Sequence, residues 1–272
     1  MPASPDPASQ LDALAQAVFA SHSYRRVCPE VVRDIGAREL AKRRNLAEAI
    51  KATKSKLHQI GGAYLTGTKY AEWLEALTKA SQADGAQALK DVCRQVMAYH
   101  SSTRERLPIL EQFYARTLAD LPPARVVLDL ACGLNPLAIP WMPLAEDVEY
   151  YACDLYEDMT DFLNGFLALA QVRGHAEARD VLNRCPTQHA DLALLLKALP
   201  CLEQLDARAG LRLLETVNAD HLLVSFPAQS LGGRKKGMVQ NYEAHFRQLV
   251  AGKLWAIRHF EFPTEVAFLI SK

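Results

Sequence analysis

VVLDLACGLNPL, at residues 126–137, is the stretch that best indicates the fold class of this sequence. It begins as an apolar run typical of a buried parallel strand, with Asp129 near its end. The small residues 131–133 follow, and Asn135-Pro136 opens the next segment. Such a corner borders the crevice at the carboxyl ends of parallel strands, where α/β proteins bind nucleotide-like ligands. An ordinary strand-to-helix corner explains it equally well, because it has one glycine instead of G-x-G-x-x-G.

The chain after residue 124 alternates between apolar runs and amphipathic segments. We expect helices in the first five gaps between seven strands, which lie at residues 125–130, 148–154, 176–180, 192–199, 221–226, 254–262 and 266–271. Pro263 and Thr264 lie between the last two strands, which predicts a hairpin. The alternation predicts a doubly wound, mostly parallel sheet, to which the hairpin adds one antiparallel strand.

The first hundred residues show helical periodicity without strand-like alternation. Another helix is expected to begin within residues 101–106, capped by Ser102 or Thr103, after helices at 11–20, 29–44, 46–60, 69–79 and 85–100. We therefore predict three parts. They are a partly disordered tail with the first helix (1–20), a helical domain (21–105) and an α/β domain (106–272).

Charge is distributed unevenly along the chain. The whole sequence is neutral, with 31 Lys and Arg against 31 Asp and Glu. Residues 21–60 nevertheless hold ten Lys or Arg against four Asp or Glu, a net charge of +6, and a second basic run lies at 234–236. A basic surface on a neutral protein is typical of a polyanion binder, although a solvated helix face is the alternative.

The cysteines and the apolar runs indicate a cytoplasmic protein. No C-x-x-C pair occurs among Cys28, Cys93, Cys132, Cys153, Cys185 and Cys201. Such scattered thiols, several of them in apolar runs, are expected to be reduced and buried, and they predict neither a metal site nor a disulfide framework. No signal-peptide pattern is visible, and the longest apolar run is too short to cross a membrane.

Two more carboxylates fall at predicted strand ends. Asp154 ends the second strand and Asp180 ends the third, so both should border the crevice at residues 131–135. Asp154 is placed to accept hydrogen bonds from two ribose hydroxyls, and Asp180 to accept one from the exocyclic amine of a base. Either could instead cap a helix. Together they favour an adenosine-like ligand.

The turn also discriminates among adenosine ligands. A pyrophosphate needs backbone N–H donors, and Pro136 removes one of them. S-adenosylmethionine (SAM), which has an amino-acid tail instead of phosphates, fits better. The carboxylate of that tail needs a cation, for which Arg106 is the candidate, and His100 and Ser102 could close over the same tail.

Several longer stretches carry a family resemblance. They are HSSTRERLP (100–108), DLACGLNPLAIPWM (129–142), LLLKALPCLEQ (194–204), SFPAQSLGGRKKGM (225–238) and, in the helical part, KATKSKLHQIGGAYL (51–65). With the Asp154 and Asp180 strand ends, these stretches resemble the aminoglycoside-resistance methyltransferases that modify N7 of guanine 1405 in 16S ribosomal RNA. The resemblance covers residues 21–272.

The resemblance implies a Rossmann-like SAM-dependent methyltransferase fold with an N-terminal helical domain that docks on the 30S subunit. It implies resistance to 4,6-disubstituted deoxystreptamine aminoglycosides. The implied SAM contacts are Tyr64, His100, Ser101, Ser102, Arg106, Ala131, Asp154, Asp180, Val181, Leu196 and Gln204. The implied RNA contacts are Arg43, Arg44, Lys51, Lys54 and Lys197, with Arg234, Lys235 and Lys236 in a loop near the target base.

We expect a mechanism without a catalytic acid or base. N7 of guanine has a free lone pair, so methyl transfer requires positioning rather than proton removal. The base would be swung out of its stack onto an apolar surface, for which Phe226, Trp141 and Met238 are candidates, although each could be ordinary core.

Other function classes stay open at this point. One is a methyltransferase acting on N1 of a nearby adenine, and another is a non-catalytic module that binds SAM or RNA. A nicotinamide oxidoreductase is less favoured, because the turn lacks the glycines of a dinucleotide site. We expect a monomer.

Overall fold

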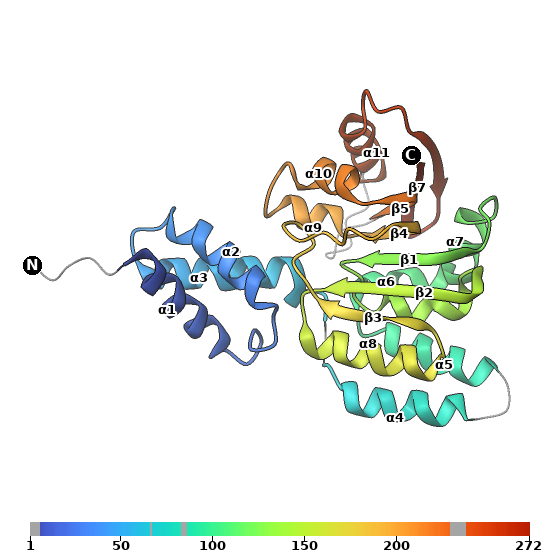
Figure 1. Cartoon of the computed structure of the whole chain (residues 1–272), viewed down its shortest axis with the longest axis horizontal. Coiled ribbons are helices and arrows are strands. Elements are labelled where there is room, and N and C mark those ends of the chain that lie inside the picture. Colours follow the sequence, from blue (N-terminus) through green and yellow to red (C-terminus); the bar gives the residue numbers. More distant parts are fainter. Residues whose placement is uncertain (1–5, 66, 83–85, 229–237) are drawn as a thin grey trace, which may run out of the picture.

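The computed structural model describes residues 6–65, 67–82, 86–228 and 238–272, and these contain one seven-stranded sheet (Figure 1). The strand order is β3-β2-β1-β4-β5-β7-β6. The strands are β1 (Ala124–Leu130), β2 (Leu144–Asp154), β3 (Arg173–Ala178), β4 (Ala190–Leu196), β5 (Ala219–Pro227), β6 (Ala256–Glu261) and β7 (Glu265–Ser271). β7 runs antiparallel to both of its neighbours, β5 and β6, and the other neighbouring strands are parallel. The predicted sheet and its terminal hairpin are therefore confirmed.

Two predicted inter-strand helices are corrected. The first gap holds only a 3-10 helix, η3 (Asn135–Trp141), because Pro140 lies inside it and has no N–H to donate. Residues 179–189, between β3 and β4, form turns and no helix. There Asp180 lies beyond the strand end, and its Oδ1 accepts hydrogen bonds from the backbone N–H groups of Leu182 (3.0 Å) and Asn183 (3.3 Å). An aspartate that bonds the backbone two residues on favours a turn over a helix.

Helices cover both faces of the sheet and bury two apolar clusters. Adjacent residues of β1 enter different clusters: Val127 faces one and Leu128 the other, because side chains alternate along a strand. Besides η3, the helices around the sheet include α6 (Ser101–Arg106), η2 (Leu107–Ile109), α7 (Leu110–Thr117), α8 (Glu157–Leu169), α9 (Leu199–Glu203), α10 (Ala209–Thr216) and α11 (Met238–Leu249).

The start of α6 differs from the prediction. His100, not Ser102 or Thr103, is its N-cap residue, and its side chain makes no capping bond. Thr103 Oγ1 donates instead to the carbonyl of Met97 (2.6 Å). Because Thr103 lies inside the helix and is buried, its hydroxyl serves the preceding backbone.

The N-terminal helices fall into two groups. α1 (Pro7–Phe19), α2 (Pro29–Leu40) and α3 (Leu46–Leu57) pack on one another and project from the sheet (Figure 1). We call residues 7–57, which contain these three helices and the turns between them, the helical unit. A π-helix, η1 (His58–Gly62), follows them. In contrast, α4 (Tyr70–Ser81) packs on α8, and α5 (Ala86–Met97) packs on η3, so both belong to the layer that covers the sheet.

The remaining sequence predictions on topology concern the tail and membranes. Helix α1 begins at Pro7, so the predicted tail is helical from there, and residues 1–5 lie outside the described residues. Within the described chain, every helix is too short or too polar to span a membrane.

Candidate active site

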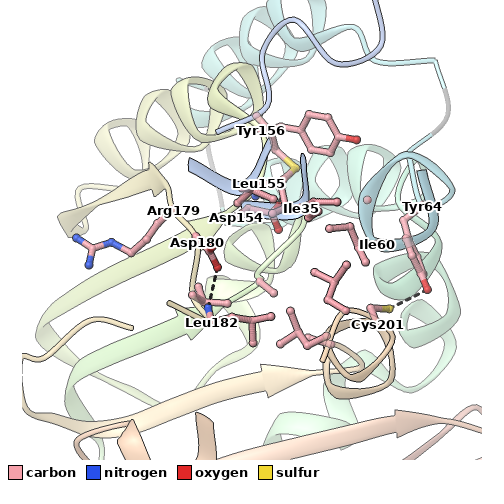
Figure 2. A pocket seen from close by; sticks show the side chains of 18 of the residues that line it. Ile35, Ile60, Tyr64, Asp154, Leu155, Tyr156, Arg179, Asp180, Leu182 and Cys201 are labelled. Atoms are coloured by element: carbon pink, nitrogen blue, oxygen red, sulfur yellow. Dashed lines mark hydrogen bonds between the residues drawn. The ribbon is translucent and has the colours of Figure 1, made fainter. Parts of the chain in front are cut away.

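A cavity of about 920 Å³, partly open to solvent, lies at the carboxyl ends of β1, β2 and β4. The strand order reverses between β1 and β4, which is where open α/β sheets bind ligands. Figure 2 shows Asp154 and Asp180 on its wall. Its apolar lining is formed by Val31, Ile35, Ile60, Leu155, Val181, Leu182, Leu196, Leu202 and Leu205.

Asp154 ties the end of β2 to the turn after β1. Its Oδ2 accepts a hydrogen bond from the N–H of Gly133 (2.8 Å), and its Oδ1 accepts one from the N–H of Leu155 (2.6 Å). Burial raises the pKa of Asp154, while these two bonds oppose the rise. Gly133 has a φ of +52°, and a Cβ there would lie 2.8 Å from the His100 ring. The glycine therefore allows both the turn and the close approach of His100.

His100 and Tyr64 form one side of the cavity without acting as acid or base near neutral pH. Their rings stack at a centroid distance of 6.0 Å, and His100 Nδ1 lies 2.9 Å from Ser102 Oγ. Burial, together with the nearby cations Lys197 and Arg106, lowers the pKa of His100 to about 4. Burial raises the pKa of Tyr64, whose hydroxyl lies 2.9 Å from Cys201 Sγ. Both groups are therefore neutral at pH 7.

Most of the predicted cofactor residues meet at this cavity. Those that line it are Tyr64, His100, Ser102, Ala131, Asp154, Asp180, Val181 and Leu196. Ser101 does not, because it is buried and donates its backbone N–H to the carbonyl of Tyr64 (2.9 Å). Gln204 is exposed, and its carbonyl accepts a hydrogen bond from Lys56 Nζ (3.2 Å).

Arg106, the predicted partner of the cofactor carboxylate, does not line the cavity either. It is 1% exposed, and its Nε and Nη2 both donate to Glu265, with 2.6 Å from Nη2 to Oε1. Its Nη1 donates to Asn135 Oδ1 (2.8 Å). A contact from Arg106 to the cofactor remains a prediction, and it would have to share the guanidinium with Glu265.

Lys197, a predicted RNA contact, is buried beside the cavity. Its side chain is 4% exposed, and its Nζ lies 3.0 Å from Glu105 Oε2 and 3.2 Å from Glu265 Oε2. The same ammonium donates to the carbonyl of Ser102 (3.0 Å). Its charge is matched inside the chain, so a contact from Lys197 to RNA remains a prediction and would have to share the ammonium with these partners.

The other predicted RNA contacts lie mainly on the helical unit. Arg43, Arg44 and Lys51 are exposed, and Lys54 is half-buried. Arg43 pairs with Glu39 on α2 (2.9 Å). The basic run Arg234, Lys235 and Lys236 lies outside the described residues.

The predicted base-stacking residues are not equivalent. Phe226 is fully buried and stacks on Tyr242 at a centroid distance of 5.1 Å, so it is core and cannot receive a base there. Trp141 lines a separate groove, and the Arg94 guanidinium lies 5.0 Å from its ring centroid. Met238 is half-buried at the start of α11, and its role stays a prediction.

Sequence reasoning missed the contribution of α2 to the cavity. Val31, Asp34, Ile35 and Arg38 all line it. They occur at helical spacing, so their pattern indicated one face of a helix. The sequence carried no signal that this face would meet the strand ends more than a hundred residues later.

Comparison with known proteins agrees with this geometry. Residues 20–270 match the family model described as ribosomal RNA methyltransferase (FmrO). The chain is 37% identical to a 16S rRNA (guanine(1405)-N(7))-methyltransferase of Micromonospora rosea, over 97% of each protein. It is 35% identical to one of Serratia marcescens, over 96% of this chain and 98% of that protein.

Solved structures of similar fold lead to the same family. The 16S rRNA methyltransferase RmtF, in complex with S-adenosyl-L-homocysteine, is 30% identical, with a TM-score of 0.84 over 97% of this chain and 98% of RmtF. The 16S rRNA methylase RmtB is 30% identical, with a TM-score of 0.78 over 96% and 98%. The sheet, its helices and its strand-end cavity thus form a SAM-dependent methyltransferase fold, and the chain belongs to the FmrO family of ribosomal RNA methyltransferases.

Proposed function

We propose that this chain transfers a methyl group from SAM to N7 of guanine 1405 of 16S rRNA within the 30S subunit. Such a modification gives resistance to 4,6-disubstituted deoxystreptamine aminoglycosides. The observation that carries the proposal is the strand-end cavity with Asp154 and Asp180 on its wall, in a chain similar over 97% of its length to a guanine-1405 N7 methyltransferase. We further propose that the protein works as a monomer in the cytoplasm.

The residues of the cavity fit SAM. Asp154 and Asp180 stand at the ends of neighbouring strands, where their carboxylates can accept hydrogen bonds from ribose hydroxyls and from an exocyclic amine. Val181, Leu182 and Leu196 add apolar lining to the same cavity, which suits a purine ring. The backbone N–H of Gly133, in the turn after β1, is already bonded to Asp154, and Pro136 has no N–H to donate. This donor set suits a nucleoside with an amino-acid tail better than a pyrophosphate.

The chain's contribution to the reaction is positioning. SAM, when bound, supplies an electrophilic methyl group on a sulfonium. Because guanine N7 carries a free lone pair, the protein has to hold the two reactants in line and exclude water, without moving a proton first. The neutral Tyr64 and His100 suit this role, since they add shape but no proton chemistry near pH 7.

The helical unit is the proposed docking element for the rRNA. It carries the exposed cations Arg43, Arg44 and Lys51 and projects from the sheet (Figure 1). Folded rRNA is recognised largely by shape and phosphate contacts, which an exposed basic bundle can provide. Within the predicted 21–105 domain, we assign docking to the helices α1–α3, and α4 and α5 to support of the sheet.

The test is methyl transfer from radiolabelled SAM to purified 30S subunits. The modified base is mapped by primer extension after borohydride and aniline cleavage. Label at N7 of guanine 1405 is the expected result. Label on another base would retain the fold and cofactor but change the target, and no label in the presence of 30S binding would favour a non-catalytic RNA-binding module.

A further inference from the structure

The helical unit contacts the α/β domain through several segments that border the cofactor cavity, and also through ion pairs from Arg26 to Glu157 and Asp161 and from Glu30 to Arg184. On one side, Cys28 donates its N–H to the carbonyl of Leu155 (2.8 Å). On the opposite side, Lys56 Nζ reaches the carbonyl of Gln204 (3.2 Å), and Arg38 reaches that of Leu205 (3.5 Å). Because Leu155 and Leu205 line the cavity, a bound ligand touches the same segments that hold the helical unit.

A further contact joins a carboxylate of the helical unit to a carboxylate of the α/β domain at the edge of the cavity. Asn183 Nδ2 donates one hydrogen bond to Asp180 Oδ2 (2.7 Å) and one to Asp34 Oδ2 (2.6 Å). Asp34 belongs to α2, whereas Asp180 follows β3, and both line the cavity. Burial raises the pKa of Asp34, and the neighbouring Asp180 raises it further. In the protein alone, one amide group therefore holds together two acids that disfavour each other's charge.

An exocyclic amine has two hydrogens to donate, and this pair of acids has two sets of acceptor oxygens. We propose that Asp34 is a second acceptor for the adenine amine of the cofactor, so that cofactor binding fixes the helical unit against the α/β domain. This inference rests on the proposed function, because it takes the ligand to be SAM and the helical unit to dock on rRNA. It follows that the cofactor and the 30S subunit strengthen each other's binding.

Such coupling is reciprocal by thermodynamic necessity: if the cofactor raises 30S affinity, the 30S subunit raises cofactor affinity by the same factor. The structure supplies the differential contact that this requires, since the amine adds donors that are absent without cofactor. A cofactor that met α2 only through the apolar side chains of Val31 and Ile35 would make no directed hydrogen bond to the helical unit.

The experiment measures the dissociation constant of S-adenosyl-L-homocysteine, which cannot transfer a methyl group, with and without saturating 30S subunits. For the wild-type protein we expect binding to tighten about fivefold or more in the presence of 30S. Asp34→Ala and Asp34→Asn should reduce this ratio to below about twofold. The asparagine variant keeps the shape but replaces one carboxylate oxygen with an NH2 group, which donates and cannot accept from the amine.

Two controls separate coupling from charge and folding. Asp12→Ala and Asp12→Asn remove the same charge from an exposed site on α1 that pairs with Arg33, and they should keep the wild-type ratio. S-inosyl-L-homocysteine carries an oxygen in place of the amine, and it should bind the wild-type protein without any tightening by 30S.

The inference is overturned if the wild-type ratio is close to one, if the Asp34 variants keep the wild-type ratio, or if the inosyl analogue is tightened as strongly as the adenosyl compound. These outcomes leave the proposed function intact, provided that the wild-type protein methylates guanine 1405. Loss of wild-type 30S binding would instead remove both proposals.

Discussion

The buried cations beside the cofactor cavity and the exposed cations of the helical unit behave in opposite ways. Arg106 and Lys197 are almost inaccessible, and both are neutralised by the buried carboxylate of Glu265. On the helical unit, Arg44 and Lys51 face solvent. Basic residues are therefore held in internal ion pairs beside the cavity, whereas on the helical unit they are exposed to solvent.

Burial, rather than residue type, therefore decides what a basic side chain of this protein can bind. A buried charge loses its hydration and must be matched inside the protein, which fixes its position. An exposed charge keeps its hydration and releases counterions when it meets a polyanion. The following tests compare the two regions in order of expected effect.

Removing the shared carboxylate of the buried network should have the largest effect. Glu265→Ala leaves Arg106 and Lys197 buried without their common partner and frees the hydroxyl of Ser225, which donates to Glu265 (2.5 Å). We expect the free energy of unfolding to fall by about 3–5 kcal/mol in urea denaturation. The control Asp120→Ala breaks an exposed pair with Arg258 and should cost about 0–1 kcal/mol. Equal losses in both variants would contradict the distinction between the two regions.

The next test addresses the cofactor cavity. Asp154→Ala removes a buried carboxylate that also orders the turn at Gly133. We expect SAM affinity, measured by calorimetry, to fall about 100-fold or more, since hydrogen bonds to charged groups contribute about 1.5–3 kcal/mol each. Asp220→Ala, at the opposite end of the sheet in an exposed pair with His189, is the matched control. Wild-type SAM affinity in Asp154→Ala would show that the cofactor binds elsewhere.

The exposed cations should affect the rRNA and not the cofactor. Replacing Arg43, Arg44 and Lys51 together by alanine should lower 30S affinity about tenfold at low salt, and it should flatten the dependence of log affinity on log salt by about 2–3 units. SAM affinity should stay unchanged. The control triple variant replaces the exposed Lys79, Arg125 and Arg173 of the α/β domain. If that variant loses the same 30S affinity, the helical unit has no special part in docking.

The smallest expected effect is a pH dependence from His100. An unfolded histidine has a pKa near 6.5, whereas burial lowers the pKa of His100 to about 4. Between these values the unfolded chain binds the extra proton, so the folded state loses stability as the pH falls. Because the ring borders the cavity, we expect a loss of only about 1–2 kcal/mol between pH 7 and pH 5.

His100→Gln should lack this contribution. Urea denaturation of both proteins at pH 7 and pH 5 checks it, because the remaining pH dependence is common to the two. An equal loss of stability in the wild-type protein and in His100→Gln would show that the imidazole is not held neutral.

Features encoded over short distances could be predicted from the sequence. The strand β1, its turn and the strand-end Asp154 follow from apolar runs and small residues that are adjacent in the chain. Asp180 was expected at a strand end and instead follows β3 in a turn, because its carboxylate bonds the backbone of Leu182. That error concerns two residues of boundary and leaves the side chain at the cavity.

Features that depend on distant partners could not be predicted. Arg106 and Lys197 looked like ligands for a carboxylate or a phosphate, since nothing in their neighbourhood revealed Glu265. Phe226 looked like a surface for a base, but Tyr242 stacks against it within the core. Asp34 looked like one acid in the basic segment 21–60, and only the fold brings it to Asn183.

The α/β class, the strand-end position of the cofactor cavity and the basic charge of the helical unit could all be predicted from the sequence. Periodicity, turn chemistry and charge are local properties of the chain. Only the tertiary structure decided which cations are free and which acids face the cavity. Burial and pairing are set by residues that lie far apart in the chain, such as Arg106 and Glu265. The role of a charged side chain is therefore fixed only when the folded chain brings its partners next to it.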